Sequence, residues 1–271
     1  FLQNIYARWQ RIDGAGAEVI PNIHPANRTD SYPLSATGQS GYHQADTACP
    51  IGEHTWAAAY LSAQCAIAGA DALAENRVAY ALCRPPGHHA FGDMAGGFCF
   101  LNNAAIAARR LAAQGKRVAI LDVDVHHGNG TQGIFWRDPS VLTVSLHADP
   151  ARFYPFFWGH AHERGAGDGL GHNLNLPLPR GTDNAAYLRA LGKALERIAA
   201  FGADTLVVAL GLDAHEADPF KGFAITTGGF AEIAATIAAL RLPTLLVQEG
   251  GYLSEDLGRN LTSFLTGFQA A

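Results

Sequence analysis

The sequence predicts a single α/β domain in which a mostly parallel central sheet carries helices on both faces and long loops at the carboxyl edge of its strands. One observation behind this prediction is that short, continuously apolar runs alternate along the chain with stretches of helical pattern, as in sheets covered on both sides. Another is that 48% of the 271 residues are hydrophobic and only 16% are charged, which suffices for a large core. No repeat or linker divides the chain, so we expect residues 1–271 to form one domain.

The expected strands are runs of Val, Leu and Ile without strict alternation, the pattern of strands buried on both faces. There are five of them: Val78–Cys83, Val118–Val125, Val141–Leu146, Thr205–Leu212 and Thr244–Gln248.

The expected helices lie between these runs. The stretch Asn103–Gln114 is rich in Ala, follows a possible Asn102 cap and stops at Gly115. The stretch Ala185–Phe201 repeats Leu and Ile every three to four residues and so has one apolar face. Three further helices are expected at Thr55–Glu75, Phe230–Leu240 and Asp256–Phe268. Two long segments rich in Gly, Pro, Asn and His are expected to be irregular, at Gly14–Pro50 and Asp149–Gly181.

Composition excludes some classes of function. The formal charge is −5 with no basic block, which argues against a nucleic-acid partner and suits a small cationic one. No apolar run reaches the ~18 residues that cross a bilayer, and the N-terminus has no signal-peptide pattern. The four cysteines form no CxxC pair, which favours reduced thiols and a cytoplasmic location. The chain does not begin with Met, and we expect the natural protein to start further upstream.

Polar residues follow the ends of the expected strands, where ligands bind in open α/β sheets. The first strand leads into His88 and His89, and the second into His126 and His127. The third ends at His147, the fourth at Asp213, and the fifth leads to Tyr252. The sequence therefore predicts a reactive site at this edge of the sheet.

Asp124 and His126 point to a metal site at the end of the second strand. Residues two apart face the same way along a strand, so both side chains can reach one ion, and Asp213 can supply a third ligand. The alternative is a hydrogen-bonded polar cluster, but two carboxylates in an apolar strand are costly unless they are paired or bind a metal. Zn²⁺ is favoured, and Fe²⁺ or Mn²⁺ also suits these ligands.

The tandem His88–His89 follows a rigid PPG turn. One imidazole can take a proton from a water while the other stays charged; the alternative is an ordinary surface pair. Tyr252 follows two glycines and can donate to an oxyanion, or it is simply a packed loop residue. Phe98 and Tyr154 are candidates to line a channel for an alkyl chain, together with Gly97.

Five motifs resemble the zinc-dependent deacetylase superfamily, which includes class II-type histone deacetylases, bacterial acetylpolyamine amidohydrolases and, more distantly, arginase. The motifs are RPPGHH, GGFCFLNNAAIAA, LDVDVHHGNGTQ, LGLDAHEADP and EGGY, and the resemblance covers about Trp56 to Phe268. The SLHADP and FYPFFWG stretches and the early FLQNIYARW look closest to acetylpolyamine amidohydrolases.

The resemblance implies an arginase/deacetylase-like fold and a role for each residue of the site. Asp124, His126 and Asp213 become zinc ligands, His89 the favoured general base beside His88, and Tyr252 the residue that stabilises the transition state. Asp122 is then the carboxylate that orients His88, and Asn129 the partner of His89. A structural K⁺ is implied at Asp122, Asp124, His126, Ser145 and Leu146.

The resemblance also concerns substrate and assembly. In the amidohydrolases an insertion before the first helix narrows the mouth of the site and joins two subunits, which implies a homodimer with Gly14–Pro50 in that place. Asp46 is a candidate to meet a substrate ammonium. Family members usually have a strand and a helix ahead of FLQNIYARW, and we expect these to be missing here.

The expected function is therefore metal-dependent hydrolysis of N-acetyl amides, releasing acetate and a free amine from acetylated polyamines. Three alternatives stay open: a class II-type deacetylase of protein acetyl-lysine, an arginase-type ureohydrolase and an inactive binding module. The ureohydrolase needs a second metal, and Gly128 and Asn129 stand where an additional ligand would be expected.

Overall fold

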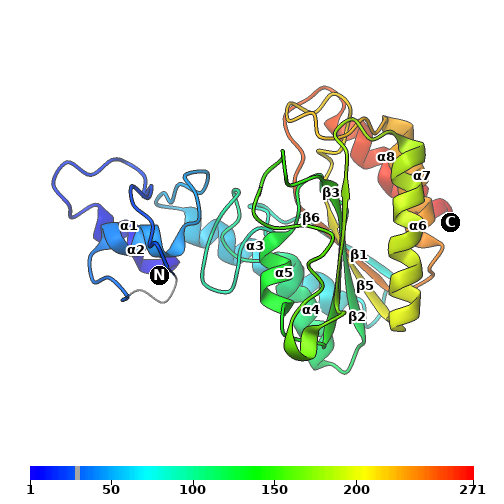
Figure 1. The fold of residues 1–271 in the computed structure, drawn as a ribbon, viewed down its shortest axis with the longest axis horizontal. Helices are drawn as coiled ribbons and strands as arrows, with labels where there is room; N and C mark the ends of the chain where they lie inside the picture. Colours follow the sequence, from blue (N-terminus) through cyan, green and yellow to red (C-terminus); the bar gives the residue numbers. More distant parts are fainter. Residues whose placement is uncertain (28–30) are drawn as a thin grey trace.

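The computed structural model describes residues 1–27 and 31–271. Its centre is a six-stranded sheet in the order β1-β6-β5-β2-β3-β4, and all five pairs of neighbours are parallel (Figure 1). The bounds are β1 Val78–Ala81, β2 Val118–Asp122, β3 Val141–Ala148, β4 Asn173–Leu178, β5 Thr205–Leu210 and β6 Thr244–Gln248. The predicted fold class is confirmed.

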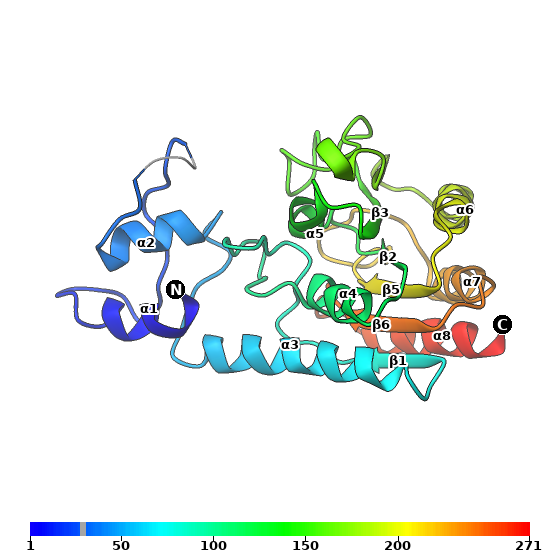
Figure 2. The same cartoon turned by 90° about the horizontal axis from the view of Figure 1, so that it is seen from below.

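Helices cover both faces of the sheet, as Figures 1 and 2 show. One face carries α3 (Thr55–Ala72), α4 (Asn103–Ala113) and α5 (Asn129–Phe135), and the other carries α6 (Asn184–Phe201), α7 (Thr227–Ala238) and α8 (Leu257–Ala270). Asn102 caps α4 as predicted, accepting a hydrogen bond from the Ala105 amide. Alanine dominates the buried surface of α3 and α4, which lets these helices pack closely on the sheet.

The strands at the centre of the sheet are buried along their whole length, which explains their continuous apolar sequence. Every residue of β2, β3 and β5 is buried, between one core beneath α6–α8 and another beneath α3 and α4. At one edge, β1 pairs only with β6 among the described strands.

Residues 1–27 and 31–50 lie beyond the N-terminal end of α3, away from the sheet (Figures 1 and 2). They contain α1 (Leu2–Trp9) and α2 (Ala36–His43), and Ile5, Val19, Ala36 and Ile51 form a small separate core. We expected residues 14–50 to be irregular. That was wrong for α2, which Ser35 caps through its hydroxyl oxygen. Residues 28–30 of that segment lie outside the described residues.

Other differences from the prediction are local. The strand β4 and a short 3₁₀ helix at Gly167–Gly169 lie inside the expected loop 149–181. The second and fourth predicted strands end earlier, at Asp122 and Leu210, and the first ends at Ala81. All four cysteines are free. Among the described residues, none of the helices is long and apolar enough to span a membrane.

Candidate active site

The site lies at the carboxyl ends of four neighbouring strands, β1, β6, β5 and β2. His88 and His89 follow β1, Asp124 and His126 follow β2, and Asp213 follows β5. The turn after β6 joins them, because the Gly250 amide donates to Asp124 Oδ2 at 2.8 Å. These residues come from distant parts of the chain and meet because the strands are parallel.

Short side chain–backbone bonds shape the segment after β2. The Asp124 amide donates to Asp122 Oδ1 at 3.1 Å, and the His126 amide donates to Asp124 Oδ1 at 2.8 Å. Regular pairing of β2 ends at Asp122, where these bonds begin, although the Val123 amide still donates to the Ala209 carbonyl and the Ala148 amide to the Val125 carbonyl. Asp124 and His126 nevertheless end on the same side, through turns and not through strand alternation.

Asp124, His126 and Asp213 form a compact, buried group of potential metal ligands. One ligand atom from each lies within 4.8 Å of the others. The Nδ1 atom of His126 is 3.1 Å from Asp124 Oδ1 and 3.0 Å from Asp213 Oδ2. The second oxygen of each carboxylate is fixed by a backbone amide, from Gly250 for Asp124 and from Val125 for Asp213.

The electrostatics of this group favour a bound cation. Burial and the charge of Asp124 raise the pKa of the Asp213 carboxyl to about 7. Burial opposes a charge on His126, but hydrogen bonds to Asp124 and Asp213 outweigh it and raise the pKa of this imidazole to about 9. Two carboxylates thus converge on one imidazole nitrogen in the interior. An O,O,N set of this kind fits a divalent transition metal and leaves coordination positions free.

The two tandem histidines are held in different environments. His88 donates from Nδ1 to Asp122 Oδ2 at 2.9 Å, and His89 donates from Nδ1 to Asn129 Oδ1 at 2.7 Å. Their ring centroids are 4.0 Å apart. The partners assigned from the resemblance are therefore the hydrogen-bond partners in the structure.

These environments separate the pKa values of the two imidazoles. Burial disfavours a charge on His88, but Asp124 and Asp122 outweigh it and hold the pKa of this residue well above its ordinary value. Burial and the neighbouring His88 and His126 hold the pKa of His89 well below its ordinary value. These directions favour the protonated form of His88 and the neutral form of His89, in which Nδ1 donates to Asn129 and Nε2 is the acceptor.

Tyr252 stands beside this group, on the turn after β6. Its ring meets Phe98 and Phe220, with centroids 6.1 and 4.7 Å away. Burial and the charge of Asp213 raise the pKa of the Tyr252 hydroxyl, so it remains a proton donor. A pocket of ≈ 1060 Å³ borders Tyr252 and Phe98 on the β1 side. None of the three potential metal ligands lines this pocket.

The four residues assigned to the channel lie together near His89. The Tyr154 hydroxyl and the Gly97 amide both donate to Asp46 Oδ2, at 2.6 and 3.1 Å, and the Tyr154 ring meets His89 edge-on. Gly97 and Phe98 have φ of 52° and 68° in a tight turn closed by paired bonds between Gly96 and Cys99. This conformation turns the half-exposed Phe98 ring outward.

The sequence analysis missed Phe220, whose ring stands 5.4 Å from that of His126 and against Tyr252. An aromatic residue in the loop after Asp213 was the available signal. Conversely, His147, which was expected at the end of a strand, lies within β3 near its carboxyl end and apart from the reactive group. It shares a hydrogen bond with Ser145 and donates to the Gly159 carbonyl.

The residues assigned to a monovalent cation lie at the junction of β2 and β3. Asp122 and Ser145 are partners in the strand register, and Leu146 follows directly. A small void of ≈ 10 Å³ borders Asp122 and Ser145.

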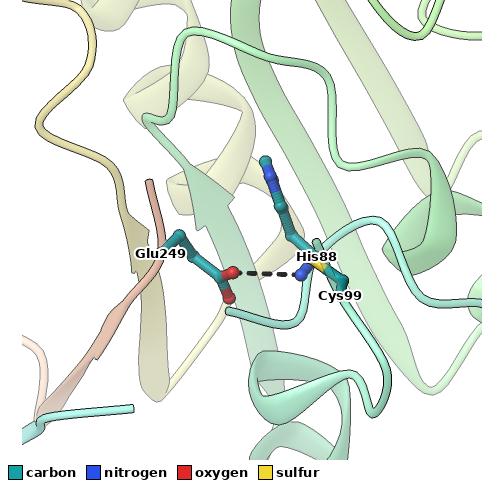
Figure 3. A group of neighbouring side chains, drawn as sticks. All are labelled: His88, Cys99 and Glu249. Atoms are coloured by element: carbon teal, nitrogen blue, oxygen red, sulfur yellow. Dashed lines mark hydrogen bonds between the residues drawn. The ribbon is translucent and has the colours of Figure 1, made fainter. Parts of the chain in front are cut away.

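A second group of potential metal ligands consists of His88, Cys99 and Glu249 (Figure 3). The dashed bond in the figure ends on the His88 backbone nitrogen and not on the ring. Burial raises the pKa of the Cys99 thiol, and His88 Nδ1 already donates to Asp122. A protonated thiol and an occupied imidazole nitrogen fit a metal poorly.

Comparison with known proteins agrees with this geometry. Residues 18–268 match the model of the histone deacetylase domain, and the chain belongs to this family. The chain is 49% identical over its full length to the acetylpolyamine amidohydrolase of Burkholderia pseudomallei, covering 79% of that protein. It is 38% identical, over 88% of its length and 64% of the relative, to a histone deacetylase-like amidohydrolase of Pseudomonas aeruginosa.

A solved structure agrees as well. The crystal structure of acetylpolyamine aminohydrolase from B. pseudomallei superposes with a TM-score of 0.96 over the whole chain, at 49% identity and 79% coverage of that structure. The resemblance inferred from the motifs is thereby confirmed.

Proposed function

We propose that this protein is a metal-dependent amidohydrolase that removes the acetyl group from acetylated polyamines. The observation that carries the proposal is the buried Asp124–His126–Asp213 group beside a charged and a neutral histidine. Support for the substrate class comes from the 49% identity to a relative named for acetylpolyamines. We propose Zn²⁺ as the resident ion because of the O,O,N ligand set, with Fe²⁺ as an alternative.

The metal site contributes one part of the chemistry. A divalent ion held by Asp124, His126 and Asp213 supplies Lewis-acid chemistry, polarising an acetyl carbonyl and making a water molecule more acidic. The backbone amides that fix the outer carboxylate oxygens keep the inner oxygens aimed at one point.

The histidines divide the proton transfers. His89 accepts the proton of the attacking water on Nε2, because Nδ1 is engaged with Asn129. His88, charged and held by Asp122, stabilises negative charge and donates a proton to the leaving amine. The Tyr252 hydroxyl donates to the developing oxyanion.

The rim of the site suits a narrow, cationic substrate. Phe98 and Tyr154 offer apolar walls for a methylene chain, and Asp46 adds a negative charge behind Tyr154. We propose that Asp46 also attracts the ammonium groups of the substrate, although its Oδ2 accepts two hydrogen bonds within the protein.

Three further features belong to the proposal. A structural K⁺ at Asp122, Asp124, His126, Ser145 and Leu146 would offset the buried carboxylates. A homodimer would bury apolar side chains that are exposed in the segment before α3, namely Ile20, Ile23, Tyr32 and Leu34. We also propose that residues 1–271 form one catalytic domain that acts in the cytoplasm.

The decisive experiment measures metal content and acetate release together. Acetylputrescine, acetylspermidine and an acetyl-lysine peptide are offered to the protein before and after chelation, and after Zn²⁺ is restored. We expect one metal per chain, activity that follows the metal, and the highest kcat/KM on the polyamines. A preference for the peptide would favour the protein deacetylase, which the histone deacetylase-like relative supports. Metal-loaded protein without acetate release from any substrate would refute the proposal.

A further inference from the structure

The peptide that carries His88 and His89 is anchored on both sides. Its carbonyl groups are held by Asn102, whose side-chain amide donates to the Ala90 carbonyl at 3.0 Å, and by the Thr131 amide, which donates to the His88 carbonyl at 3.1 Å. The amides of Gly87 and His88 are bound instead by the residue that directly follows β6. The acceptors of these amide hydrogen bonds therefore help to fix the backbone position from which the two imidazole side chains extend.

Glu249 supplies the acceptor for two of these amides. The Gly87 and His88 amides both donate to Glu249 Oε2, at 2.7 and 3.0 Å. Figure 3 draws the bond from His88. The next amide, that of His89, hydrogen-bonds to the Cys99 sulfur. Glu249 and Cys99 therefore hold the backbone of the His88–His89 segment through hydrogen bonds from its amides.

Glu249 is itself fixed and buried. Its side chain is 5% exposed, and it directly follows β6, the only described strand that pairs with β1. The other carboxylate oxygen, Oε1, is buried with no hydrogen-bond partner. Burying an ionisable group costs free energy, and the two hydrogen bonds from backbone amides offset part of that cost. No step of the proposed reaction uses this carboxylate.

We infer that Glu249 is a positioning residue, which sets the place of the His88–His89 peptide through its two amide hydrogen bonds. The inference rests on the proposed function, since it concerns the rate of the same reaction. The role of Glu249 requires a side chain long enough to place an acceptor oxygen within hydrogen-bond distance of the Gly87 and His88 amides. Its negative charge is secondary.

Two substitutions separate reach from charge. Glu249→Gln retains the length and one acceptor oxygen and loses the charge, whereas Glu249→Asp retains the charge and loses the reach. We expect Glu249→Gln to keep kcat within about threefold of wild type. For Glu249→Asp we expect kcat to fall by about 10- to 100-fold with KM changed less than threefold, since a displacement near 1 Å can cost 10²-fold.

The matched control is Glu163→Gln together with Glu163→Asp. Glu163 Oε2 likewise accepts a loop amide, from Gly159 at 2.8 Å, but its other partners are the side chains of Gln132 and Asn175 and not the histidine peptide. We expect both control variants to keep the wild-type kcat. All rates are divided by the folded, metal-loaded fraction, measured by thermal melting and metal analysis.

The outcomes are distinct. Equal rates for Glu249→Gln and Glu249→Asp, or a slower Gln variant, would overturn the inference. A loss of rate that merely follows a loss of folded, metal-loaded protein would make Glu249 a structural residue and also overturn it. Wild-type protein that releases no acetate would refute the proposed function instead.

Discussion

A single methyl group at Gly250 is expected to dismantle the metal site. A Cβ added there would lie 2.3 Å from Asp213 Oδ2 and 2.5 Å from Asp124 Oδ2, whereas ordinary contact begins at 3.4 Å. The two carboxylates would have to move by about 1 Å, and metal sites tolerate deviations of only about 0.2 Å. Since such a displacement costs about 100-fold in rate, we expect Gly250→Ala to lose at least that much kcat/KM together with most of its metal.

The assay compares Gly250→Ala with Gly192→Ala, an identical chemical change. A Cβ at Gly192, inside α6, meets nothing within 4 Å, and alanine stabilises a helix interior by up to about 1 kcal/mol over glycine. The control should therefore keep its activity and melt at a higher temperature. Metal content is measured by mass spectrometry and the rate on acetylputrescine. Gly250→Ala protein with a full metal complement and a rate within threefold of wild type would refute the reasoning.

Four further predictions concern individual side chains and the cysteines. Tyr252→Phe should keep its metal and lose roughly 10²–10³-fold in kcat, because one oxyanion donor is removed; undiminished kcat would end its assigned role. Phe98→Gly should be more stable than Phe98→Ala by roughly 1 kcal/mol in chemical denaturation, because φ at this position is 68° and only glycine adopts it without cost; equal stabilities would contradict this. Burial raises the pKa of Cys49 and Cys83 to about 12, so both thiols stay protonated at pH 8. Iodoacetamide at pH 8 should label the partly exposed Cys65 in native protein and all four thiols after denaturation, as mass spectrometry would show. Because unfolded thiols ionise near pH 9.0, the fold should also lose stability as the pH rises from about 9 toward 12.

The parts of the fold that the sequence predicts are those where burial is uniform. The strands β2, β3 and β5 are buried throughout, so their sequences are continuously apolar. The strand β4 escaped prediction because it lies at the edge of the sheet, is half-buried, and contains Pro177 and two asparagines. The helix α5 escaped because two glycines in seven residues weaken its helical pattern.

The residues of the candidate site also divide into those that the sequence predicts and those that it does not. Asp124, His126 and Asp213 could be proposed because each lies at or near the carboxyl end of an apolar strand, where ligand-binding residues gather in this class of fold. The roles of Glu249 and Phe220 could not be inferred from position alone, although Glu249 directly follows β6 and Phe220 lies in the loop after Asp213. Glu249 contacts a peptide 161 residues earlier in the chain, and the place of Phe220 depends on where a loop folds back. Contacts of this kind depend on the three-dimensional arrangement and leave no local pattern.

The pairing of β1 with β6 affects when the site can form during synthesis on the ribosome. Thr244–Gln248 is synthesised after every other described strand, yet among the described strands it is the only neighbour of β1. A nascent chain that stops at Leu240 holds both histidines but lacks the strand that fixes them and the turn that contacts Asp124. Catalysis should therefore appear only once Thr244–Gln248 has left the exit tunnel and paired with β1.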